Sequence, residues 1–172
     1  VWIPTQYGGK DVPTDIVPVP KHLHYDLWLG PVHYRPYHPE WVPFKWRNWW
    51  AFGGGALADF GCHYMDLPHW ALNLSHPLTV EVVDGPPVHP ESTPPWLIVR
   101  YEHPARGPLP PVKLTWYHGG KQPDLLTQDQ KAKWKSGVLF IGDKGMLLAD
   151  YGRHALLPEK DFAGFKPPEP FI

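Results

Sequence analysis

The spacing of hydrophobic residues changes close to residue 75 of this 172-residue chain. Residues 56–72 repeat apolar positions at the helical period of about 3.6 residues, which predicts an amphipathic helix that Pro68 is expected to end or kink. Short runs rich in β-branched and aromatic residues follow, and such runs predict strands. The apolar side of the predicted helix holds Leu57, Phe60, Tyr64 and Ala71.

The strands are expected to be neighbours joined by short connections, because Asp143-Lys144 separates two of them as a two-residue hairpin signal. A short first strand is also possible at the extreme N-terminus. A helix followed by several neighbouring strands predicts an α+β fold, with a mostly antiparallel open sheet that carries helices on one face. The predicted strands are residues 79–83, 96–102, 112–117, 137–142 and 145–150.

The first third of the chain, residues 1–52, is predicted to form long loops rich in proline and tryptophan, with one helical turn at 26–29. The 24 prolines and 16 glycines approach the content of disordered chains, but ten tryptophans are typical of a folded domain. Residues 124–135 fit either a loop or a short helix, and the tail at 167–170 is expected to be extended.

The composition argues against several classes of partner. A net charge of −1 gives no electrostatic basis for binding nucleic acid or an anionic membrane. No apolar run is long enough to span a bilayer, and the N-terminal residues do not resemble a signal peptide, so a cytoplasmic location is favoured. The single cysteine, Cys62, excludes an intrachain disulfide and is interpreted as a packing residue.

Candidate chemistry lies on the polar side of the predicted helix. Asp59, His63 and Asp66 fall within roughly 60° of one another there, although an ordinary solvated helix face would give the same pattern. With His69 these residues could also form a metal site, but no completing ligand pair is evident elsewhere. The sequence contains no glycine fingerprint for a dinucleotide and no phosphate-binding loop.

A second group of candidates lies in the aromatic segment at 34–50. Aromatic rings stack on the C–H faces of sugars, and planar polar groups pair with sugar hydroxyls. Tyr37, Arg47 and Trp50, together with Asp66, are therefore candidate substrate-binding residues. The alternative is that this loop is simply fixed to the protein core by its own tryptophans.

The segment G-G-G-A-L-A-D-F-G-C-H-Y-M-D at 53–66 resembles the substrate-domain motif of the Gfo/Idh/MocA oxidoreductases, which include glucose–fructose oxidoreductase and inositol dehydrogenase. Further blocks are similar to a bacterial branch of predicted sugar dehydrogenases in that family. These blocks are D-L-W-L-G-P at 26–31, R-P-Y-H-P at 35–39, F-K-W-R-N-W-W at 44–50, V-K-L-T-W-Y-H-G-G at 112–120 and V-L-F-I-G-D-K-G at 138–145.

The resemblance implies that two domains bind the cofactor and the substrate separately. In this family an N-terminal Rossmann domain binds NAD or NADP, and a C-terminal α/β domain holds the sugar and commonly forms the dimer interface. It also implies that Asp59 and His63 are catalytic, with His63 as the acid/base and Asp59 orienting either the imidazole or the substrate. A neutral imidazole suits proton transfer near pH 7.

The sequence departs from the family because the glycine fingerprint and the Glu-Lys-Pro segment are missing. Residues 1–172 are therefore expected to be a single substrate and dimerisation domain, stand-alone or truncated, with no Rossmann domain and no cofactor of its own. It would bind a small sugar-like ligand and form a homodimer or higher homo-oligomer through its sheet.

Two alternatives remain open. A separate Rossmann chain could supply NAD or NADP and complete the enzyme in trans. The chain could instead be a non-catalytic module that binds a carbohydrate or a protein through the loop at 34–50.

Overall fold

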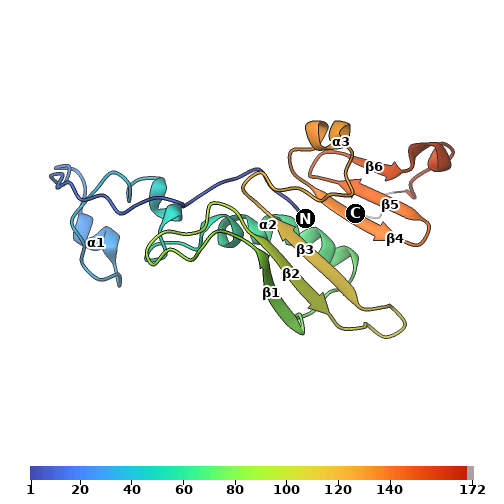
Figure 1. The fold of residues 1–172 in the computed structure, drawn as a ribbon, viewed down its shortest axis with the longest axis horizontal. Helices are drawn as coiled ribbons and strands as arrows, with labels where there is room; N and C mark the ends of the chain where they lie inside the picture. Colours follow the sequence, from blue (N-terminus) through green and yellow to red (C-terminus); the bar gives the residue numbers. More distant parts are fainter. Residues whose placement is uncertain (170–172) are drawn as a thin grey trace.

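The computed structural model describes residues 1–169 and has an elongated shape (Figure 1). Long loops with α1 form one end, a three-stranded sheet with α2 lies in the middle, and a second three-stranded sheet forms the other end. The elements in chain order are α1 (Tyr25–Leu29), η1 (Lys45–Asn48), α2 (Gly55–Ala71), β1 (Thr79–Asp84), β2 (Ile98–His103), β3 (Val112–Tyr117), α3 (Gln128–Lys133), β4 (Val138–Gly142), β5 (Gly145–Ala149), β6 (His154–Leu157) and η2 (Glu159–Phe162).

The predicted α+β class with antiparallel pairing is confirmed, but the strands form two sheets where the sequence predicted one. The first sheet has the order β1-β2-β3 and the second has the order β4-β5-β6, with antiparallel pairing throughout. The predicted hairpin is present, because Gly142 pairs with Gly145 across Asp143-Lys144. The sixth strand was not predicted, since the sequence of β6 has no clear alternation of apolar and polar residues.

The N-terminal segment joins the two sheets. Trp2 forms a parallel bridge to Tyr117 at the end of β3 and an antiparallel bridge to Gly137, just before β4. The Trp2 amide donates to the Gly137 carbonyl at 2.9 Å, and the Gly137 amide donates back at 3.0 Å. On the other side, the Tyr117 amide donates to the Val1 carbonyl at 2.9 Å. The short strand expected at the N-terminus therefore lies between the two sheets.

Helix α2 packs its apolar side on the first sheet, as the helical period predicts. Leu57, Phe60 and Tyr64 contact the core that includes Val99 of β2 and Trp116 of β3. Trp116 is fully buried. This packing fixes which side of α2 faces solvent, and with it the position of the polar residues on the helix.

Three sequence-based expectations about α2 need correction. The helix continues through Pro68 to Ala71, because a proline lacks only one hydrogen bond of its own and this one lies in the last turn. Ala71 is exposed, since the helix end extends past the packed part of the sheet. Cys62 is exposed as well, so the interpretation as a packing residue was wrong.

The loop region, defined here as residues 1–52, has a hydrophobic core of its own. Tyr25, Leu29, Tyr37, Trp41 and Trp49 are buried together there. The rings of Trp41 and Trp49 meet edge to face, with centroids 4.7 Å apart. Aromatic packing of this kind holds a proline-rich segment in one conformation with few regular backbone hydrogen bonds.

The remaining predictions concern residues 124–135, the tail and membrane-spanning segments. Residues 128–133 form the short helix α3, in which Thr127 and Gln130 form a capping box. The tail shows no helix or strand over 167–169, and Pro170 lies outside the described residues. In residues 1–169, no helix is both long enough and apolar enough to cross a membrane.

Two buried histidines generate a prediction about stability. Nδ1 of His118 accepts the indole N–H of Trp116 at 2.9 Å, which requires neutral imidazole, and burial lowers the pKa of His118. Burial likewise lowers the pKa of His103. Both groups bind protons more strongly in the unfolded chain, so the free energy of unfolding should fall as pH decreases below about 6.5, by up to ~1.4 kcal/mol per pH unit for each histidine.

Urea denaturation between pH 7.5 and pH 5 measures this dependence. His118→Gln should reduce the slope, because glutamine does not titrate, whereas His22→Gln at an exposed position should leave it unchanged. An identical slope for His118→Gln and the parent chain would show that His118 does not contribute.

Candidate functional site

The best-defined polar contact in the central part of the molecule joins Arg47 and Asp59. Nε of Arg47 donates to Oδ2 of Asp59 at 2.8 Å, and both side chains are about three-quarters buried. Arg47 belongs to η1, and Asp59 lies in the second turn of α2. The loop between them contains Gly53 and Gly54, which allow the chain to reverse so closely.

The guanidinium of Arg47 contacts two aromatic rings. Its central carbon is 4.7 Å from the ring centroid of Phe44 and 4.2 Å from that of Trp46. The two cation–π contacts and the ion pair to Asp59 hold the guanidinium in place. Its remaining N–H groups are therefore oriented before any ligand arrives.

Tyr7 contributes a hydroxyl to the same cluster from the N-terminal segment. Its ring packs between Phe44 and Phe60, with centroid distances of 6.3 Å to each. Burial raises the pKa of the Tyr7 hydroxyl, and a hydrogen bond to the Asp59 carboxylate raises it further. The phenol therefore remains protonated at neutral pH and acts as a donor toward Asp59.

His63 lies one helical turn after Asp59 and is exposed. Its ring is tilted toward Phe60 at a centroid distance of 5.9 Å. In the described part of the chain, Asp59 hydrogen-bonds to Arg47, and no hydrogen bond joins Asp59 to His63. Asp59 thus presents its carboxylate to the same solvent-facing side of α2 as the imidazole, without orienting the ring directly.

The other candidate substrate-binding residues lie apart from this cluster. Tyr37 is buried in the core of the loop region, where its ring meets Tyr25 edge to face. Asp66 is exposed two turns further along α2, where its charge acts on the Tyr151 hydroxyl. Among residues 1–169, Arg47 is the one predicted substrate-binding residue of the four that forms a hydrogen bond, an ion pair or a ring contact with Asp59 or His63.

Trp50 borders a cavity of about 290 Å³ at the start of α2. Its indole N–H donates to the His89 carbonyl at 3.2 Å, and the ring is 46% exposed. The same cavity is lined by Ala56, Leu57 and His118. Its walls are mainly apolar, so a ligand would find a stacking surface there and few hydrogen-bond partners.

The glycine run at the start of α2 does not fit a dinucleotide. A side chain at Gly53 would lie 3.1 Å from the Trp46 ring, and one at Gly55 would lie 2.8 Å from Thr93. These glycines are required by contacts within the protein, not by a pyrophosphate approaching the backbone. No step of a reaction is therefore assigned to a nicotinamide bound here.

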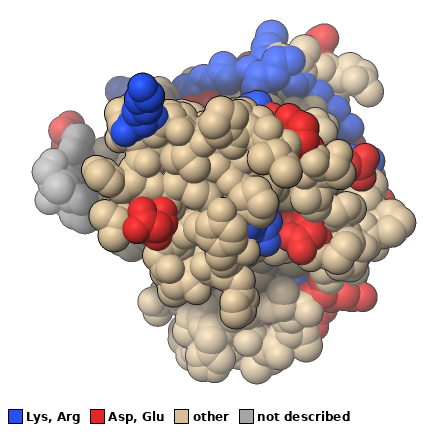
Figure 2. Space-filling view, turned by 90° about the vertical axis from the view of Figure 1, so that its left-hand side faces the viewer, with Lys and Arg blue, Asp and Glu red and all other residues tan. Residues whose placement is uncertain are grey.

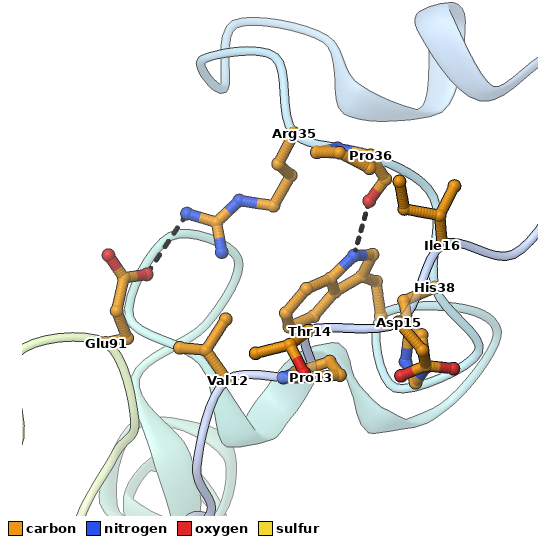
Figure 3. A pocket seen from close by; sticks show the side chains of 10 residues that line it. Val12, Pro13, Thr14, Asp15, Ile16, Arg35, Pro36, His38 and Glu91 are labelled. Carbon is orange, nitrogen blue, oxygen red and sulfur yellow. Dashed lines mark hydrogen bonds and ion pairs between the residues drawn. The ribbon is translucent and has the colours of Figure 1, made fainter.

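A second cavity, of about 220 Å³, lies in the loop region (Figure 3). The Arg35 guanidinium reaches across it to Glu91 at 3.2 Å and packs against the Trp41 ring at 5.2 Å. His38 and Asp15 pair at 3.2 Å on the opposite side. Figure 2 views the molecule from this end and shows a mostly uncharged face, with Lys and Arg side chains gathered along its upper edge.

Sequence reasoning missed Tyr7 and Arg35. Tyr7 follows the N-terminal strand and reaches the cluster only because that strand is anchored between the sheets. Arg35 belongs to the segment R-P-Y-H-P, which resembles the family, and this resemblance could have marked it as a candidate. In residues 1–169, no group of three His, Cys, Asp or Glu side chains is arranged to hold a metal ion.

The comparisons with known proteins identify the family of this chain. A search of curated proteins gave no match. The family model described as "Oxidoreductase family, C-terminal alpha/beta domain", of the Gfo/Idh/MocA group, matches residues 2–107, which is more than half of the chain and includes the Arg47–Asp59 cluster. The chain therefore belongs to the Gfo/Idh/MocA oxidoreductase family and contains its C-terminal alpha/beta domain.

Proposed function

We propose that this domain binds a sugar-like ligand through Arg47, Asp59 and His63 and serves as the substrate domain of an NAD(P)-dependent sugar dehydrogenase. The observation that carries the proposal is the Arg47–Asp59 ion pair, whose guanidinium contacts the rings of Phe44 and Trp46 and whose carboxylate lies one helical turn before His63. A planar cation, a carboxylate and stacked rings are the groups that bind sugars.

The geometry favours distinct roles for the three side chains. Arg47 and Asp59 would bind neighbouring hydroxyls, because their ion pair uses one nitrogen of the guanidinium and one oxygen of the carboxylate. His63 would accept the proton of the hydroxyl that becomes a carbonyl, because an imidazole exposed beside the pair can exchange protons with solvent. Tyr7 would hold the Asp59 carboxylate in position.

Substitutions at Arg47 and at Arg35 test which of the two places binds the sugar. Saturation-transfer NMR with glucose and myo-inositol would measure affinity for the parent chain and for variants. Arg47→Ala should weaken binding about tenfold or more, because hydrogen bonds to charged groups contribute about 1.5–3 kcal/mol each. Arg35→Ala, in the cavity of the loop region, is the matched control and should leave the affinity unchanged.

The opposite result would favour the second candidate function, a non-catalytic carbohydrate-binding module. The observation that supports it is the Arg35 cavity, where Nε of Arg35 is buried and has no hydrogen-bond partner among residues 1–169. If Arg35→Ala weakens sugar binding while Arg47→Ala does not, the catalytic-site interpretation is wrong. Circular dichroism of each variant would establish that the fold is retained.

The proposed function also makes a prediction about cofactor. The purified chain should not reduce NAD or NADP in the presence of sugars, because its glycine run packs against Trp46 and Thr93. Activity should require a Rossmann domain, supplied on a separate chain or by fusion. Absorbance at 340 nm measures it, and saturable reduction by the isolated chain would contradict the proposal.

We further propose a homodimer formed through the first sheet. Strand β1 is exposed along its whole length, and its Val80 and Val82 are 59% and 61% exposed. They lie on the same face as Val99 and Tyr101 of β2, beyond the cover of α2. Apolar residues on an unpaired edge strand favour association with a second copy.

Light scattering of the eluting protein tests this assembly. The parent chain should have the mass of a dimer at micromolar concentration, and Val82→Lys should shift it to a monomer by placing a charge in the interface. Val88→Lys is the control, because Val88 is 92% exposed in the loop between β1 and β2. A monomeric parent chain would refute the dimer without affecting the sugar site.

A further inference from the structure

The two sheets leave a gap between β3 and β4 next to the N-terminal strand. Trp2 bridges the sheets at one end of these strands, and Figure 1 shows the N-terminus between them. Beyond this bridge lies a groove of about 530 Å³, lined by 112–115 of β3 and 138–142 of β4. The end of α2, at Pro68, Ala71 and Leu72, closes one face of the groove.

The backbone groups along both walls follow a fixed pattern. Amide and carbonyl groups of successive strand residues point in opposite directions. The Tyr117 amide and carbonyl both bond to the N-terminal strand, so those of Thr115 and Lys113 point the same way. Gly137 bonds to Trp2 in the same manner, so the corresponding groups of Leu139 and Ile141 point into the groove from β4.

These groups lack backbone partners over most of the groove. The Thr115 carbonyl accepts the Val1 nitrogen at 2.9 Å. In residues 1–169, no hydrogen bond outside the strand pairing within each sheet is found for the Thr115 amide or for the backbone amide and carbonyl groups of Lys113, Leu139 and Ile141. Two strand edges with unpaired groups therefore face each other across a space that one strand would fill.

We infer that this groove binds an extended polypeptide strand that lies outside these 172 residues and continues the line of Val1–Ile3. About four residues would span it, at ~3.3 Å per residue. The strand would run parallel to β3 and antiparallel to β4, as Trp2 does. It would join the two three-stranded sheets along their length, by the same β-strand addition that many peptide complexes use.

The register assigns a partner to every residue of the strand, counted backward from Val1. The first and third residues pair with Leu139 and Ile141 of β4, because Trp2 pairs with Gly137. On β3 the parallel bridge of Trp2 to Tyr117 places the first and third residues opposite Thr115 and Lys113. The hydrogen bonds to β3 would come from the second residue, between the Thr115 amide and the Lys113 carbonyl, and from the fourth, at the Lys113 amide. A strand between two edges uses the amide groups of every residue, whereas a strand added at a single outer edge uses only alternate ones.

The two faces of the groove also select side chains. Val1 and Ile3 belong to the core beneath α2, and Leu114 and Phe140 lie on that same face. The second and fourth residues of the strand share this face and should be apolar. The first and third share the face of Trp2, next to Thr115 and Lys113, so polar β-branched residues fit there. The expected occupant reads apolar-polar-apolar-polar toward Val1.

This inference is independent of the sugar site, because the groove lies at the opposite end of α2 from Asp59. The probe is a blocked peptide containing Val-Thr-Val-Thr, added to the full chain at millimolar concentration. NMR-detected hydrogen exchange should slow at least tenfold at the amides of Lys113, Thr115, Leu139 and Ile141. The amides of Leu114 and Trp116, which face β2, serve as internal controls and should not change.

Methylated peptides distinguish the groove from an outer edge. N-methylation of either of two consecutive central residues should abolish protection, since each amide has a partner in the groove. The phase-shifted peptide Thr-Val-Thr-Val, of identical composition, should bind at least tenfold more weakly. Sensitivity to methylation at alternate residues only, or protection at β1 or β6 instead, would overturn the inference.

If the free peptide binds too weakly to detect, the same sequence can be attached to the chain. Val-Thr-Val-Thr placed directly before Val1 acts at a high effective concentration. It should lower the unfolding equilibrium constant at least tenfold relative to Gly-Ser-Gly-Ser at the same place. Ala71→Glu in the groove should reduce that gain, whereas Cys62→Glu, exposed on the same helix, should not. Equal stability of the two extended chains, with no peptide protection, would refute the strand.

Discussion

The double pairing of Trp2 holds the molecule together. One residue donates to and accepts from Gly137 and lies beside Tyr117, so three hydrogen-bonded residues of one short strand connect two separate sheets. The Trp2 indole is fully buried and donates to the Trp134 carbonyl at 3.1 Å. Its burial in the second sheet's core contributes about 1.5–3 kcal/mol, so the connection rests on one anchored side chain as much as on its backbone.

The same strand determines the geometry of the candidate site. Residues after Ile3 cross the start of α2, which brings Tyr7 to Asp59. The loop region then returns with Arg47 only because its own aromatic core fixes the path of η1. The site is thus assembled from helix α2 and two segments with little regular structure, the N-terminal segment and the stretch around η1. Polar groups positioned this way need no rearrangement to meet a ligand.

The sequence predicted the elements whose period is unambiguous and missed those that depend on distant contacts. Helix α2 and strands β1 to β5 follow from spacing alone, and the position of Asp59 on a solvent-facing side follows from α2. The pairing of Asp59 with Arg47 could not be predicted, because it depends on how the loop region folds back. Strand β6 was missed because its short sequence acquires strand geometry only by pairing with β5.

Helix α2 links the candidate site to the groove. Asp59 lies near its start and Ala71 at its end, which places them about 18 Å apart at 1.5 Å per residue. The helix packs rigidly on β2 and β3, whose free edge forms one wall of the groove. A strand that fills the groove would fix β3 against β4, and it would therefore restrict the surface on which α2 rests. Filling the groove would therefore also fix the positions of Asp59 and His63, because both lie on α2.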